Sequence, residues 1–231
     1  MTVQTTSPRS LALFGVTRGI GLLLLQRALQ AGHSVRVLVR DAAAFEARLS
    51  TLSLASDARS RVHIHEGDAL RDDDVRAVVR GTDAVLSALG APARSNSKVR
   101  SEGTAVIARV MQQEGVDRIV AVSVYGAADT RTSLPFFLRW VIFPFYLNKA
   151  VAEHERQERI LQDSGLAWTA VRPPNLVDDD TSGPDVELVH GLGVVPGMSM
   201  EVSRDEVAAF MLDAVESQRY IRGAPALARA A

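Results

Sequence analysis

The stretch LALFGVTRGIG, at residues 11–21, decides the fold of this chain. Its first four residues are apolar, which is typical of a buried strand, and a largely apolar segment with the length of a helix follows it. Glycines let the backbone turn sharply and approach a ligand, and a helix N-terminus offers unpaired N–H groups to an anion. A tight turn without a ligand is the plainer alternative, but the strand before it and the helix after it favour a phosphate site. The residues expected to hold a diphosphate are Gly15, Thr17, Arg18, Gly19, Ile20 and Gly21.

Apolar runs alternate with helical patterns along the rest of the chain. The predicted strands are Leu11–Phe14, Val35–Val39, Val62–His65, Ala84–Ser87, Ile119–Val122 and Trp168–Val171. The predicted helices are Ile20–Ala31, Asp72–Arg80, Val99–Glu114 and Ala150–Ser164, each followed by a glycine that is suited to end it. Alternation of this kind produces βαβ units and a parallel sheet, so we expect a Rossmann-type doubly wound α/β fold.

Length and composition fit one domain. The chain has 231 residues, of which 47% are hydrophobic and 23% charged, as in ordinary globular proteins. No internal repeat or long linker divides it, so we expect a single domain over 1–231, with residues 1–9 flexible. Two irregular segments, 127–147 and 178–200, follow the later strands, and we expect them to form a substrate pocket at the carboxyl edge of the sheet.

Several classes of function are disfavoured. The net charge is −1 without a dominant basic stretch, so nucleic acid is not an expected partner. The chain has no cysteine, which excludes disulfides and thiolate chemistry, and its five histidines lack metal-site spacing, so no metal is expected. Residues 1–10 lack the apolar core of a signal peptide, and the apolar stretch Leu134–Leu147 is too short to span a bilayer. We therefore expect a cytoplasmic protein that binds a small-molecule substrate.

The end of the second strand indicates the cofactor. Arg40 stands where an acidic residue would accept a hydrogen bond from the ribose of NAD, and its guanidinium suits a 2′-phosphate. Arg18 in the glycine turn would assist it. NADP(H) is therefore favoured over NAD(H), with the alternative that Arg40 is solvated and Asp41 binds the ribose.

Further cofactor contacts are expected after the later strands. Asp68 would accept from the adenine amino group, or it caps a local turn. The small residues in Ala88-Leu89-Gly90 would allow close approach of the nicotinamide ribose. Pro173 and Asn175 end the sixth strand, where Asn175 reaches either the cofactor amide or a substrate oxygen, or serves as a turn residue.

With these motifs in hand, the sequence resembles the atypical short-chain dehydrogenase/reductase superfamily. The similarity covers Leu11 to about Tyr220 and is greatest to the NAD(P)H-binding branch of biliverdin-IXβ reductase (flavin reductase) and NmrA-like proteins. It rests on the glycine turn, Val37–Asp41, Gly67-Asp68, Ser87–Gly90, Gly115–Val120, His154–Asn175 and Val202–Ala208, the last of which resembles the start of the family's closing helix. The resemblance implies an NADP(H)-dependent reductase, or a non-catalytic NADP-sensing regulator.

The sequence departs from that superfamily at two places. Arg18 stands where the atypical branch usually has a glycine. Typical members also carry a proton-donating tyrosine four residues before a lysine, but Phe145 stands four residues before Lys149 and Tyr146 is out of register. The biliverdin/flavin reductase branch likewise lacks this pair and relies on cofactor placement and on protonation by solvent or substrate. The second departure therefore favours that branch.

Three side chains are candidates for the chemistry. Ser123 and Tyr125 follow the fifth strand, where the serine would orient a carbonyl and the tyrosine would donate a proton, or both serve the strand end structurally. His154, early in a predicted helix, would exchange a proton near neutral pH, or lies on a solvated face.

The aromatic-rich segment Phe136–Tyr146 leaves three interpretations open. It is a lid over a flat substrate, a homodimer surface or a core helix. The whole pattern predicts an NADP(H)-dependent oxidoreductase that transfers hydride to a conjugated or carbonyl-bearing acceptor such as a flavin, quinone or tetrapyrrole.

Overall fold

A parallel sheet of six strands forms the centre of the structure, a computed structural model that describes residues 7–55, 57–91, 97–128, 148–177, 188–191, 198–199 and 201–230. The strands are β1 (Ser10–Phe14), β2 (Ser34–Val39), β3 (Val62–Glu66), β4 (Ala84–Ser87), β5 (Arg118–Val122) and β6 (Ala167–Val171). Their order is β3-β2-β1-β4-β5-β6, so the direction of winding reverses between β1 and β4. In open α/β sheets, ligands bind outside the carboxyl ends of the strands at this reversal.

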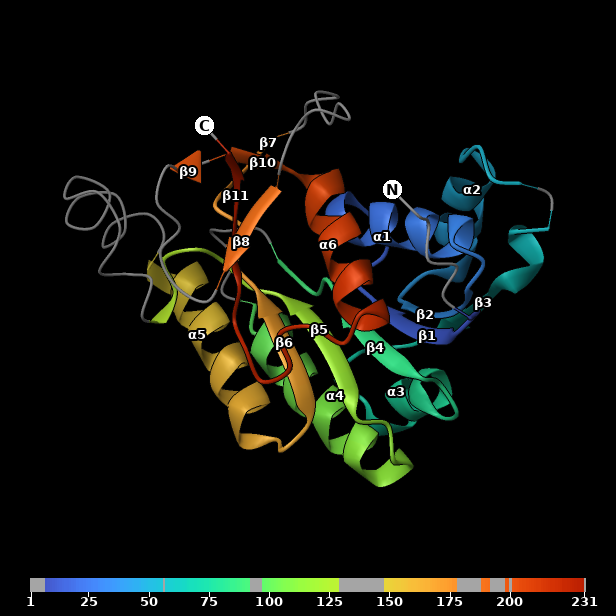
Figure 1. Cartoon of the computed structure of the whole chain (residues 1–231). Helices are drawn as coiled ribbons and strands as arrows, with labels where there is room; N and C mark the ends of the chain where they lie inside the picture. The colour runs from blue at the N-terminus through green and yellow to red at the C-terminus, as the bar shows by residue number, and fades with distance from the viewer. Residues whose placement is uncertain are drawn as a thin grey trace.

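Helices cover both faces of the sheet (Figure 1). One face carries α1 (Gly19–Gln30) and α6 (Arg204–Glu216), and the other carries α3 (Asp72–Val79), α4 (Val99–Glu114) and α5 (Asn148–Asp163). Side chains alternate between the two cores along each strand, since Leu11 and Leu13 of β1 face α1 whereas Ala12 and Phe14 face the opposite helices. The predicted doubly wound α/β fold is confirmed.

Helix α1 is apolar on nearly all sides because it lies between the sheet and α6. Its buried residues include Leu22, Leu24, Leu25 and Leu29. Asp205 at the start of α6 accepts two hydrogen bonds from Arg27 of α1, one of them 2.7 Å long from Nε. The start of α6 is therefore held against α1, close to the carboxyl edge of the sheet.

The predicted elements agree with the observed ones to within two residues at each boundary. The prediction indicated only the start of α6, and it missed α2 (Ala42–Ser50) and the short strands β7 (Asn175–Val177), β8 (Leu188–Gly191), β9 (Met198–Ser199), β10 (Glu201–Ser203) and β11 (Ala226–Ala230). Strand β7 pairs with β10, and β11 pairs with β8 and β9. These pairings hold the chain after β6 near the sheet and lead it back into α6.

Two predicted segments fall largely or wholly outside the described residues. These are Leu134–Leu147, which includes the aromatic-rich segment, and most of 178–200. In the part of the chain that is described, no helix has both the length and the apolar character needed to cross a membrane.

Close backbone contacts fix the turn between β1 and α1. Gly15 has a φ of +78°, and a Cβ added to it would stand 2.4 Å from the carbonyl oxygen of Ala88, which follows β4. A Cβ on Gly21 would stand 2.1 Å from the carbonyl oxygen of Gly15. Both distances are far below van der Waals contact, so the turn requires glycine at these two positions.

We expect Gly15→Ala to destabilise the protein more than Gly115→Ala. Gly115 has a similar φ of +69° but no atom within 4 Å of an added Cβ, so its substitution costs only the left-handed conformation, about 1–2 kcal/mol. Gly15→Ala adds the clash with Ala88, roughly another 1–3 kcal/mol. Urea unfolding followed by circular dichroism measures both values. Equal losses in the two variants would show that the Ala88 turn moves aside without cost.

Candidate functional site

The N-terminus of α1 is left open by its own side chains. Its N-cap residue, Arg18, is extended and makes no side-chain capping hydrogen bond, and the first turn holds no acidic residue. By contrast, Asp41 caps α2 by accepting from the Ala44 N–H at 2.8 Å, and α6 begins with a capping box. The first N–H groups of α1, above a turn of bare glycine backbone, therefore fit an anion such as a diphosphate.

The adenosine end of the site lies beside β2 and β3. Arg40 is exposed at the end of β2, as a contact to a 2′-phosphate requires. Asp41, the alternative partner for a ribose, has one carboxylate oxygen engaged in capping α2. Asp68 is partly buried, and one of its carboxylate oxygens accepts from the Leu70 N–H at 3.0 Å in a local turn.

A third arginine, besides Arg18 and Arg40, lies near the diphosphate region of the site. Nε of Arg204, in the first turn of α6, lies 3.8 Å from the position that a Cβ of Gly19 would occupy. Its charge therefore lies beside the glycine turn, although the two residues are far apart in sequence. Sequence reasoning missed Arg204 because the resemblance marked Val202–Ala208 only as a helix start.

The carboxyl end of β4 lies directly against the glycine turn. Ala88 and Leu89 contact Gly15, as a binding crevice at the β1/β4 reversal requires. Gly90 is exposed, and Nη2 of Arg100 would lie only 2.9 Å from a Cβ at that position. The structure thus brings the glycine turn together with the predicted Ala88–Gly90 contact region.

Ser123 belongs to a buried network at the ends of β5 and β6. Its hydroxyl donates to Oε1 of Glu158 in α5 at 2.5 Å. The guanidinium of Arg172 donates to both oxygens of the same carboxylate, at 2.9 and 2.7 Å. All three side chains are at most 3% exposed. Since Glu158 accepts, the proton of Ser123 points toward α5 and is not available to a substrate carbonyl.

Tyr125 and Pro173 are joined through the backbone. The N–H of Tyr125 donates to the carbonyl oxygen of Pro173 at 2.8 Å, and both residues are buried. Asn175, two residues further on, is exposed at the start of β7. The predicted contact residues after β5 and β6 therefore meet at one edge of the sheet.

His154, on α5, is buried and does not lie on a solvated face of the helix. It is 8% exposed, and its Nδ1 has no hydrogen-bond partner among the described residues. Burial lowers the pKa of His154 well below its ordinary value of 6.5, and the positive charge of Arg100 lowers it further. The imidazole is therefore neutral at pH 7, which does not fit the expected proton exchange near neutrality.

Sequence reasoning missed Glu158, Arg100 and Gln157 as members of this edge. One signal was present, because Glu158 lies four residues after His154 and so occupies the same face of a helix. No sequence pattern marked Arg100, because its neighbours in space come from the loop after β4 and from α5. No group of three potential metal-ligating side chains occurs among the residues that the structure describes.

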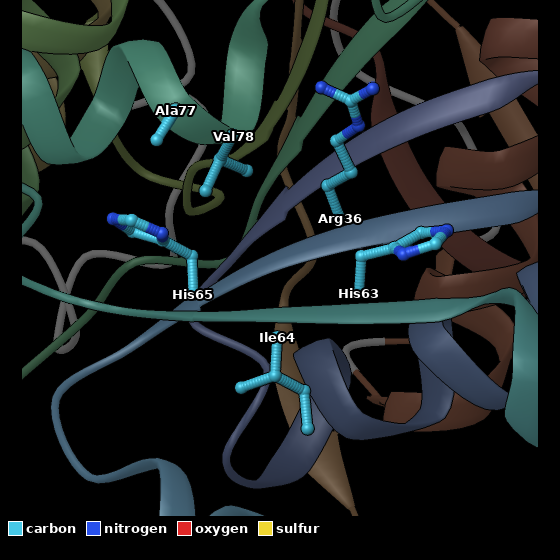
Figure 2. Close-up of a pocket in the computed structure, with 6 residues that line it drawn as sticks. All are labelled: Arg36, His63, Ile64, His65, Ala77 and Val78. Atoms are coloured by element: carbon cyan, nitrogen blue, oxygen red, sulfur yellow. The ribbon is translucent and has the colours of Figure 1, made fainter.

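A hollow of about 240 Å³ lies elsewhere, at the outer edge of the sheet. Figure 2 shows Arg36, His63 and His65 on the side of α3, with Ile64 pointing to the other face. Arg36 and His63 are opposite each other in the register of β2 and β3, at mid-strand. The hollow is therefore separate from the carboxyl edge, where the candidate cofactor residues meet.

We expect that lowering the pH below 6.5 decreases the free energy of unfolding more steeply in the wild type than in His154→Gln. The pKa of His154 is lowered in the folded state, so below pH 6.5 the unfolded chain binds a proton that the folded chain excludes. Stability from this group is present above pH 6.5 and is lost as the pH falls, by at most about 1.4 kcal/mol per pH unit. Urea titrations at pH 7.5, 6.5 and 5.5 measure the difference. Parallel profiles would place the imidazole in contact with water.

Comparisons with known proteins agree with this geometry. A family model described as NAD(P)H-binding matches residues 15–218. Three solved structures share the fold at low sequence identity. Anaerobillin reductase ChuY from Escherichia coli O157:H7 is 20% identical (TM-score 0.71), with 95% of this chain and 96% of that chain covered. A short-chain dehydrogenase/reductase from Veillonella parvula in complex with NADP is 18% identical (TM-score 0.71; coverage 95% and 94%). The oxidoreductase ylbE from Lactococcus lactis is 14% identical (TM-score 0.77; coverage 95% and 90%).

The family match begins at Gly15, the first glycine of the turn, and extends into the loop that follows α6. It therefore includes the glycine turn, the ends of β4, β5 and β6, and both helices that contribute Arg100 and His154. The NAD(P)H-binding resemblance inferred from the sequence is confirmed, and the chain belongs to the NAD(P)H-binding family of Rossmann-type proteins.

Proposed function

We propose that this protein is an NADP(H)-dependent reductase that transfers hydride to a small conjugated or carbonyl-bearing acceptor. The observation that carries the proposal is the uncapped N-terminus of α1 beside Gly15, whose backbone contacts Ala88 at the reversal of the sheet. Two of the similar structures are described as an anaerobillin reductase and an oxidoreductase, which supports a redox reaction for this protein too.

Different residues of the chain would bind different parts of the cofactor. The glycine turn and the first N–H groups of α1 would bind the diphosphate, with Arg204 adding positive charge nearby. Arg40 would bind the 2′-phosphate, and Ala88 to Gly90 would border the nicotinamide ribose. When bound, the dihydronicotinamide supplies the hydride, and the protein orients the acceptor and excludes water.

Arg40→Ala should remove the preference for NADPH over NADH. A guanidinium hydrogen-bonded to phosphate contributes roughly 1.5–3 kcal/mol, so the affinity for NADPH should fall roughly tenfold to a hundredfold. The affinity for NADH, which lacks the 2′-phosphate, should stay within a factor of about two. Isothermal titration calorimetry with both coenzymes gives these values.

Arg48→Ala is the matched control, because Arg48 is an exposed arginine at the end of the following helix, α2. It should leave both affinities unchanged. An unchanged NADPH preference in Arg40→Ala would assign the 2′-phosphate to another residue.

Tyr125 is the proton donor we propose for the acceptor. The hydroxyl proton of Ser123 is directed at Glu158, and the imidazole of His154 is neutral at pH 7. Tyr125 lies two residues after this serine, just past the end of β5, and is held by its backbone hydrogen bond to Pro173. Ser123 would then accept a hydrogen bond from the substrate or from water.

NADPH oxidation with a panel of flavins, quinones and tetrapyrroles tests the activity. We expect the wild type to reduce at least one acceptor, and Tyr125→Phe to lower kcat about a hundredfold without changing NADPH affinity. Tyr220→Phe is the control, since the Tyr220 hydroxyl pairs with His190, in the sheet of β8, β11 and β9. An unchanged kcat in Tyr125→Phe would indicate protonation by solvent. A wild type that oxidises no NADPH with any acceptor would overturn the reductase proposal.

A non-catalytic NADP sensor is the second candidate function. It is favoured by the same two observations, namely that the Ser123 proton is engaged by Glu158 and that His154 carries no charge at pH 7. Tight NADP(H) binding without turnover, and a protein partner retained in only one redox state of the cofactor, would support it.

A further inference from the structure

Three neighbouring elements, β4, α4 and α5, carry buried polar atoms without hydrogen-bond partners. Among the described residues, Ser87 Oγ, Arg100 Nε, His154 Nδ1 and Gln157 Oε1 have none. Ser87 and His154 are more than nine-tenths buried. Buried polar atoms in folded proteins are nearly always hydrogen-bonded, so four such atoms in one region indicate a place built for a polar ligand.

The fold places these atoms on one side of the sheet. Ser87 lies two residues after Val85 and so on the same face of β4, and Val85 packs in the core beneath α3, α4 and α5. Gln157 reaches across to α4, where its amide donates to the Thr104 hydroxyl at 3.3 Å. Thr104 lies one helical turn after Arg100, and Gln157 lies one turn after His154, so α4 and α5 carry three of the four atoms and β4 carries the fourth, Ser87 Oγ.

Arg100 is the only charged member of this group, and its charge has no counter-ion among the described residues. The nearby carboxylate of Glu153 accepts instead from the Ser101 hydroxyl at 2.8 Å and from Arg156 at 2.9 Å. Burial lowers the pKa of Arg100, and the charge of Glu153 only partly opposes this effect. Removing a charge from water without pairing it is costly, so the arrangement favours a bound anion.

The guanidinium of Arg100 lies at the proposed nicotinamide end of the candidate cofactor site, away from the diphosphate turn. It contacts Gly90, two residues beyond the Ala88 peptide that packs against Gly15. The positive groups near the diphosphate turn, Arg18 and Arg204, come from the elements on the α1 and α6 face. Arg100 comes from the opposite face, on the same side as Ser123 and Glu158.

We propose that Arg100 binds an anionic oxygen group, a carboxylate or a phosphate, on the acceptor molecule, with Ser87 and His154 as neutral hydrogen-bonding partners. The proposal rests on the reductase function above and narrows it to acceptors that carry a negative charge beside their reducible ring or carbonyl. The cofactor phosphates are the other source of the same chemistry, and the experiment separates the two.

FMN and riboflavin form a matched pair of probes, because they share the isoalloxazine ring and differ by one phosphate. In the wild type, kcat/KM with NADPH should be roughly tenfold to a hundredfold higher for FMN than for riboflavin. Arg100→Met should remove this ratio by lowering the FMN value alone, and Arg100→Lys should restore part of it. The Kd for NADPH should not change.

Arg159→Met is the control for net charge, because Arg159 is an exposed arginine on α5. It should keep the FMN to riboflavin ratio of the wild type. Circular dichroism and thermal unfolding confirm that each variant is folded.

Two results would overturn the proposal. One is an equal FMN to riboflavin ratio in the wild type and Arg100→Met, and the other is an increased Kd for NADPH in Arg100→Met, which would assign the guanidinium to the cofactor. If the wild type reduces neither flavin, quenching of flavin fluorescence by the NADP⁺-loaded protein measures FMN and riboflavin affinity directly. A phosphate-dependent affinity that Arg100→Met abolishes would then support the anion site although the reductase activity had failed.

Discussion

The backbone of Gly15 lies against the peptide that joins Ala88 to Leu89, and the site depends on this contact. A side chain at position 15 would stand 2.4 Å from the Ala88 oxygen, so only glycine allows the turns after β1 and β4 to meet. The two strands are neighbours in the sheet, although seventy residues separate their turns. Their contact directs the start of α1 into the crevice at the reversal of the sheet, where its N–H groups face a ligand.

Five of the six central strands were predictable because each is a run of mostly buried, mostly apolar residues, whereas β3, with the sequence VHIHE, shows apolar and polar residues in alternation. Four predicted strands begin one residue late, at Ser10, Ser34, Arg118 and Ala167. Three of these residues are polar, so the apolar pattern does not include them although their backbones belong to the strands. Helix α2 was missed because it buries only Phe45 and Leu49, too few to give a periodic signal. Strands β7, β9 and β10 have two or three residues each, too few to show alternation.

The cofactor side of the site was easier to predict than the acceptor side, for a physical reason. The glycine turn and Arg40 lie within 26 residues of sequence, and local geometry alone gives them meaning. The acceptor side is assembled from distant pairs, since Ser123 reaches Glu158 across 35 residues and Arg172 reaches the same carboxylate across 14. A single sequence shows which residues are polar, but only the packing of α4 against α5 shows which of them meet.

The buried ion pair of Glu158 and Arg172 fixes the positions of neighbouring groups more than it stabilises the fold. Desolvation offsets most of the attraction between two buried charges, and an apolar pair of similar volume is often as stable. Loss of one partner, however, leaves the other charge buried and unpaired, so the two side chains constrain each other strongly. Because Ser123 donates to the same carboxylate, the pair also fixes the hydroxyl at the end of β5. The constraint ties β5, β6 and α5 together at the edge where hydride transfer would take place.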